Sequence, residues 1–90
     1  MAHVQRDQKK LLSRIRKIQG QLSALETALQ EGGDCSKTLV QIAAIRGAVH
    51  GLMTEVLSAH LQEHVGAERD EKKRNRELAA IAELIRTYLK

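Results

Sequence analysis

The chain has 90 residues, a length that predicts a single domain over residues 1–90. It contains no proline, phenylalanine or tryptophan, and Tyr88 is its one aromatic residue, so we expect an all-α protein with a thin core that needs oligomerisation for stability. Its formal net charge of +4, from 15 basic and 11 acidic residues, is a moderate bias towards an anionic partner.

Several classes of protein are disfavoured by simple features of the chain. The N-terminal stretch MAHVQRDQKK lacks the apolar segment of a signal peptide, and no apolar run approaches the ~20 residues of a membrane span. The lone cysteine cannot form a disulfide within the chain and fits a reducing compartment. No phosphate-binding loop, catalytic triad or paired carboxylates suggest catalysis. We therefore expect a cytoplasmic protein that is not an enzyme and does not enter a membrane.

The first predicted helix runs from about Arg6 to Glu31. Its apolar residues recur at helical spacing and form one stripe: Leu11, Leu12, Ile15, Ile18, Leu22, Leu25 and Leu29. Basic residues lie on other faces, and Asp7 is the only acidic residue between Met1 and Ala24. Most basic stripes are solvated surfaces, but a surface that needs only solubility mixes its signs of charge.

This one-signed stripe predicts a DNA-binding surface. Arg14 and Lys17 are the first candidates for phosphate contacts, and Lys10 and Arg16 are the next. Arg46 is added because it is the only charged residue between Lys37 and Glu55, although an ion pair between subunits explains it almost as well.

Gly32 and Gly33 end the first helix, and Asp34 is a plausible N-cap for a second helix from Cys35 to Val65, which Gly66 ends. The two helices form an αα-hairpin in which the numbers of facing residues add to about 65. Residue 3 then lies opposite residue 62.

The second helix separates Cys35 from His60 by 25 steps, or about 38 Å at 1.5 Å per residue. Metal–ligand bonds are only about 2.0–2.3 Å long. One copy therefore cannot bring both side chains to one ion, whereas two antiparallel copies that cross near Gly47–Val49 can, and small residues there allow close approach. The predicted two-fold axis lies near Ala48.

In such a dimer His3, His60 and His64 of one copy converge with Cys35 of the other. Removal of Met1 would add the Ala2 amine. A helix start favours the thiolate form of Cys35, which binds metals, although free cysteines are commonly just small buried apolar residues. The spacing of His60 and His64 puts both rings on one helix face, a weak signal alone. His50 is interpreted as an interface or surface residue.

Residues 67–76 (AERDEKKRNR) are highly charged and are interpreted as a connector or a solvated first turn. A third helix follows, to about Leu89. Its apolar face, Leu78, Ile81, Leu84, Ile85, Tyr88 and Leu89, is expected to pack on the hairpin or between dimers.

Three stretches of the chain carry a family resemblance: IRKIQGQL, CSKTLVQIAAIRGAVHGLMTEVLSAHL and the terminal IRTYLK. Together they resemble the copper-, nickel/cobalt- and formaldehyde-sensing family of small bacterial repressors (the CsoR, RcnR and FrmR types) over essentially the whole chain. The resemblance implies a dimer of antiparallel hairpins that assembles into a tetramer. It also implies binding to operator DNA without a helix-turn-helix, and release when an inducer binds.

The chain resembles the nickel/cobalt-sensing type best, because His3, Cys35, His60 and His64 all match that type. The resemblance implies these four residues and the N-terminal amine as metal ligands. Copper sensors carry a second cysteine where His64 stands, and its loss disfavours Cu(I). Persulfide sensors also need two cysteines. Formaldehyde sensors pair a residue-2 proline amine with the cysteine, whereas this chain has Ala2. Imidazoles with one thiolate suit Ni(II), Co(II) and also Zn(II).

The leading hypothesis is thus a homodimeric or homotetrameric repressor that leaves operator DNA when Ni(II) or Co(II) binds. The alternative within the same fold is a formaldehyde-responsive repressor that uses the Ala2 amine and Cys35. A cytosolic metal-storage or delivery protein, or a purely structural bundle, are alternatives of other classes.

Overall fold

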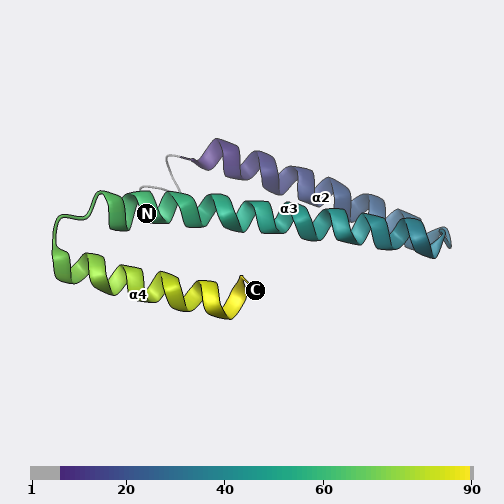
Figure 1. Ribbon diagram of the computed structural model, residues 1–90. Coiled ribbons are helices and arrows are strands. Elements are labelled where there is room, and N and C mark those ends of the chain that lie inside the picture. The colour runs from purple at the N-terminus through teal and green to yellow at the C-terminus, as the bar shows by residue number, and fades with distance from the viewer. Residues whose placement is uncertain (1–6, 90) are drawn as a thin grey trace.

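A computed structural model describes residues 7–89 of the chain. Within that range it consists of α2 (Gln8–Gln30), α3 (Cys35–Leu61), a single turn of π-helix, η1 (Gln62–Gly66), and α4 (Glu71–Tyr88), with no strand among the described residues. Figure 1 shows α2 and α3 as a long antiparallel hairpin, with α4 turned back alongside the second half of α3. For the described residues, the prediction of an all-α chain with three long helices is confirmed.

The single chain is elongated. Its Cα radius of gyration is 17.2 Å and its principal extents are 56 × 28 × 13 Å. A compact domain of this length has a radius of gyration of about 12 Å. One copy therefore does not close a core around itself.

The hairpin turn follows from two consecutive glycines. Gly32 has a φ of 68°, a left-handed conformation that glycine adopts without strain, and the Gly33 N–H donates to the Ala28 carbonyl at 2.9 Å. Asp34 takes the predicted N-cap position of α3, but its side chain makes no capping hydrogen bond. Its carbonyl instead accepts from the Thr38 amide and hydroxyl, at 3.0 and 3.1 Å.

The turn sets which residues face one another across the hairpin. Lys10 pairs with Glu55, and Arg14 lies over Gly51, so the two residue numbers of each contact add to 65 (10 and 55, 14 and 51). The predicted register is therefore confirmed. Leu11 and Ile18 are the buried residues of α2.

The second predicted helix is helical through Gly66, but its α-helical part ends at Leu61 and η1 continues it with π geometry. Residues 67–76, interpreted as a connector or a solvated first turn, divide between the two: residues 67–70 connect η1 to α4, and α4 begins at Glu71 with largely exposed residues. Asp70 caps this helix by accepting a hydrogen bond from the Lys72 amide at 3.0 Å. The Asp70 cap and the good helix formers that follow it therefore allow a helix to start within this highly charged segment.

Much apolar surface remains exposed on the single chain. Among the described residues only Leu11, Ile18, Ala59 and Ile81 form a buried apolar core. Exposed large apolar side chains run along all three helices and include Leu22, Leu29, Leu39, Val40, Ile42, Val49, Met53, Leu84 and Tyr88. None of the helices in the described part of the chain is long and apolar enough to cross a membrane.

Candidate metal-sensing and DNA-binding residues

The two histidines of the predicted site lie together at the end of the long helix. His60 is in the last turn of α3 and His64 is in η1. Their rings stack with a centroid distance of 4.4 Å and an interplanar angle of 29°. His64 lies in a π-helical turn, and such turns occur frequently at functional sites.

A residue of α4 also contacts this pair. Nε2 of His60 lies 3.1 Å from Oε2 of Glu77, and both side chains are partly buried. A carboxylate on one ring nitrogen fixes the orientation of an imidazole, an arrangement that is common behind metal-ligating histidines. Sequence reasoning missed Glu77, since only the return of α4 along α3 brings it to His60.

Cys35 lies at the opposite end of α3, as the first residue of that helix, and its side chain is exposed. The helix runs unbroken from Cys35 to Leu61, so the axial separation of about 38 Å from Cys35 to His60 applies to the folded chain. The structure thus does not bring Cys35 and the two histidines together within one copy.

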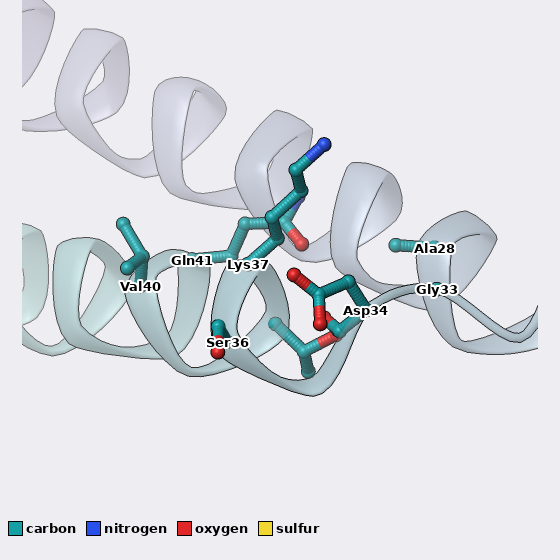
Figure 2. A pocket seen from close by; sticks show the side chains of 8 residues that line it. Ala28, Gly33, Asp34, Ser36, Lys37, Val40 and Gln41 are labelled. Atoms are coloured by element: carbon teal, nitrogen blue, oxygen red, sulfur yellow. The ribbon is translucent and has the colours of Figure 1, made fainter.

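Figure 2 shows a surface hollow between the hairpin turn and the first turns of α3, and Cys35 is not among the residues that line it. Lys37 and Gln41 border it, and Asp34 contributes the only carboxylate to its lining, which includes no histidine. Residues 7–89 hold no group of three or more histidine, cysteine, aspartate or glutamate side chains that could bind a metal ion. The predicted metal site is therefore not formed by residues 7–89 of a single copy.

Two of the predicted metal-site residues, Ala2 and His3, lie outside the described residues. Near the predicted two-fold axis, Gly47 is exposed and a Cβ atom there would meet no atom within 4 Å. This part of α3 is open to close approach in the single chain.

The five basic residues predicted to bind DNA fall into two groups. Arg16 and Lys17 on α2 and Arg46 on α3 are exposed, and none of them makes an ion pair with another residue of the described range. Lys10 and Arg14 instead reach across the hairpin to Glu55, with Nζ–Oε2 at 3.2 Å and Nη2–Oε1 at 3.3 Å. Sequence reasoning did not single out Glu55, although the predicted register places it opposite Lys10.

Comparison with known proteins identifies the family. The sequence pattern of the family described as "Metal-sensitive transcriptional repressor" matches residues 7–90. The chain belongs to this family. Its members are transcriptional repressors, so the resemblance and the prediction of a non-enzymatic regulator are confirmed.

Relatives match over the full length of both chains. The protein named "Transcriptional repressor RcnR" from Escherichia coli (strain K12) is 48% identical over 90 residues. A Serratia marcescens protein named "Uncharacterized protein in bioA 5'region" is 50% identical over 91 residues.

A solved structure shares the fold. It is a glutamate-to-histidine variant of the formaldehyde-responsive regulator FrmR from Salmonella enterica serovar Typhimurium, with a TM-score of 0.82 and 43% identity. The match covers 92% of this chain and 94% of that one. The proteins that resemble this chain therefore include one named for its response to formaldehyde.

Proposed function

We propose that this metal-sensitive repressor binds operator DNA and releases it when Ni(II) or Co(II) binds. The observation that carries the proposal is the stacked pair of His60 and His64 at one end of α3, with Cys35 at the other. Two imidazoles and a thiolate are borderline to soft ligands that suit Ni(II) and Co(II), and also Zn(II). The relatives named RcnR, at 48% identity over their whole length, support assignment to this type.

The ion would be held between subunits. His60 and His64 of one copy would act with Cys35 of the partner subunit, and His3 and the Ala2 amine would complete the set. Antiparallel pairing of two α3 helices near Ala48 brings these ends together, and the large exposed apolar surface of the single chain needs such a partner. Pairs of these dimers would form the tetramer, and each chain from residue 1 to 90 would act as one unit.

Coupling to DNA would follow from the position of these ligands. An ion held by these ligands would supply a crosslink between the N-terminal tail, the end of α3 and the partner subunit. The basic residues Arg14 and Lys17 lie about two to three turns into the first helix, too far along it for direct blocking of the DNA surface. Glu77 ties His60 to α4, and the Lys10 and Arg14 pairs tie α2 to α3, so a fixed site selects one arrangement of helices. DNA would prefer another arrangement.

The decisive experiment measures binding to a labelled duplex from the region upstream of the gene, with and without Ni(II), Co(II), Zn(II), Cu(I) and formaldehyde. We expect salt-sensitive binding that Ni(II) or Co(II) weakens and Cu(I) does not. By reciprocity, DNA must weaken metal binding by the same factor, commonly about 1–3 kcal/mol. Equal metal affinity of free and DNA-bound protein would exclude the mechanism.

A second candidate function is a formaldehyde response, favoured by the exposed Cys35 and by the solved relative that is described as formaldehyde-responsive. The Ala2 amine and the Cys35 thiol would condense with formaldehyde into an N–CH2–S bridge, with loss of one water molecule. Mass spectrometry after treatment would reveal the one-carbon bridge. A metal-storage protein, in contrast, would show no salt-sensitive binding to the duplex.

A further inference from the structure

Three charged side chains meet across the hairpin, Lys10 and Arg14 from α2 and Glu55 from α3. Each oxygen of the Glu55 carboxylate takes one cation, Lys10 Nζ at 3.2 Å and Arg14 Nη2 at 3.3 Å. The side chains of Lys10, Arg14 and Glu55 are 59%, 39% and 33% exposed. One carboxylate thus neutralises part of the one-signed basic stripe while the cations remain within reach of solvent.

The residue one turn before Glu55 makes this arrangement fit. A Cβ atom at Gly51 would lie only 3.1 Å from Nη1 of Arg14, so the guanidinium occupies the space of the missing side chain. Arg14 therefore lies against α3 and points at Glu55. Its Nε is buried and has no hydrogen-bond partner among the described residues, so this docked position leaves a donor unsatisfied.

From these contacts we propose that Glu55 is an internal competitor of DNA phosphate for Lys10 and Arg14. The inference rests on the proposed DNA-binding function of the basic stripe. A carboxylate and a phosphate accept hydrogen bonds from the same guanidinium and ammonium donors. DNA must therefore displace Glu55 from both cations and hold its phosphates near a carboxylate of like charge.

The consequence is a brake on affinity that does not depend on base sequence. Phosphate contacts orient a protein on DNA but carry no sequence information directly. Glu55 should thus lower binding to operator and random duplexes alike. The brake should also weaken as salt rises, because the three side chains are exposed enough to be screened.

The test compares the DNA affinity of Glu55→Gln with that of the wild-type protein. Both are measured on a labelled duplex from the upstream region and on a random duplex of equal length. Exposed ion pairs contribute little individually, so we expect about two- to fivefold tighter binding at low salt, on both duplexes. The plot of log K against log salt should become steeper by about one for each additional phosphate that the variant binds.

Glu26→Gln is the matched control. This substitution removes the same charge as Glu55→Gln. Glu26 is exposed on α2 and forms no ion pair with another residue in the described part of the chain. We expect only a small increase in affinity from it. In a Lys10→Gln/Arg14→Gln background, Glu55→Gln should increase affinity no more than Glu26→Gln does, since the cations it releases are gone.

Two outcomes would overturn the inference while leaving the repressor proposal intact. Equal increases in affinity from Glu55→Gln and Glu26→Gln would mean that only net charge matters. Weaker binding by Glu55→Gln would mean that Glu55 positions Arg14 for DNA instead of competing for it. If the wild-type protein binds neither duplex, the proposed function itself fails and the inference falls with it.

Discussion

A mixture of two variants, each lacking one proposed metal ligand, should recover complete metal sites if each site is shared between subunits. Cys35→Ala removes the thiolate and His64→Leu removes one imidazole, so neither variant alone holds a complete set. In a dimer of one copy of each, one of the two shared sites carries both changes. The other site combines Cys35 of the His64→Leu chain with His60 and His64 of the Cys35→Ala chain and is intact.

The fraction of metal sites that the mixture should recover follows from the length of α3 and from two-fold symmetry. Cys35 and His60 are the two ends of one unbroken helix and lie about 38 Å apart along it, which excludes a site within a single chain. Random exchange makes half of the dimers mixed, and each mixed dimer has one intact site of two, so about a quarter of the wild-type sites should return.

The assay unfolds the two variants together, refolds them, and titrates Co(II) against a chelator that outcompetes incomplete sites. Charge-transfer absorption from thiolate to Co(II) reports the sites that contain Cys35. A matched mixture of Cys35→Ala with His50→Gln tests the recovery of active protein, because His50 is an exposed residue outside the proposed site. This mixture should retain about half of the sites whether the ligands come from one subunit or two.

No recovery of sites in the first mixture, with half retained in the second, would refute the shared site. The reasoning from the length of α3 would then fail, and the ligands of the ion would have to be sought elsewhere in the chain.

Four single substitutions give further tests. Cys35→Ala should abolish DNA release by metal or formaldehyde but not DNA binding, as fluorescence anisotropy would measure, because Cys35 is the only thiol. His64→Leu should weaken Ni(II) and Co(II) binding at least about tenfold, or ~1.4 kcal/mol, in chelator competition, and spare any aldehyde response. Lys17→Gln should reduce the salt slope of log K by about one for each lost phosphate contact. Ile18→Ala should lower the free energy of unfolding in urea by about 2–4 kcal/mol, since the side chain is only 9% exposed.

Each of these expectations has an outcome that contradicts it. A full response by Cys35→Ala would make the cysteine a packing residue, and unchanged metal affinity of His64→Leu would favour the formaldehyde response. An unchanged salt slope for Lys17→Gln would move the DNA surface away from α2. Unfolding of Ile18→Ala is compared with that of the wild-type protein at equal protein concentration, because the stability of an oligomer depends on concentration. Equal stability of the two proteins would mean that α2 and α3 do not share a core.

The sequence alone determined the parts of the fold that depend on neighbouring residues. Apolar residues at helical spacing, in a chain without proline, predicted three helices. The Gly32–Gly33 pair predicted a turn, and Gly32 takes a φ of 68° in that turn. That turn fixes the hairpin register, so the pairing of Lys10 with Glu55 was within reach of sequence reasoning. The separation of Cys35 from His60 also follows from the sequence, because an α-helix rises by a constant amount per residue.

Only the tertiary structure decided which residue of α4 contacts His60. Glu77 reaches His60 because α4 folds back along α3, a direction that no local pattern encodes. Periodicity likewise predicted a helix through Val65 but did not reveal that its last turn is π-helical, because both helix types fit the same short apolar pattern. Hydrogen bonds between near neighbours are set by consecutive residues, whereas the path of α4 and the contact of Glu77 with His60 depend on segments that are distant in sequence.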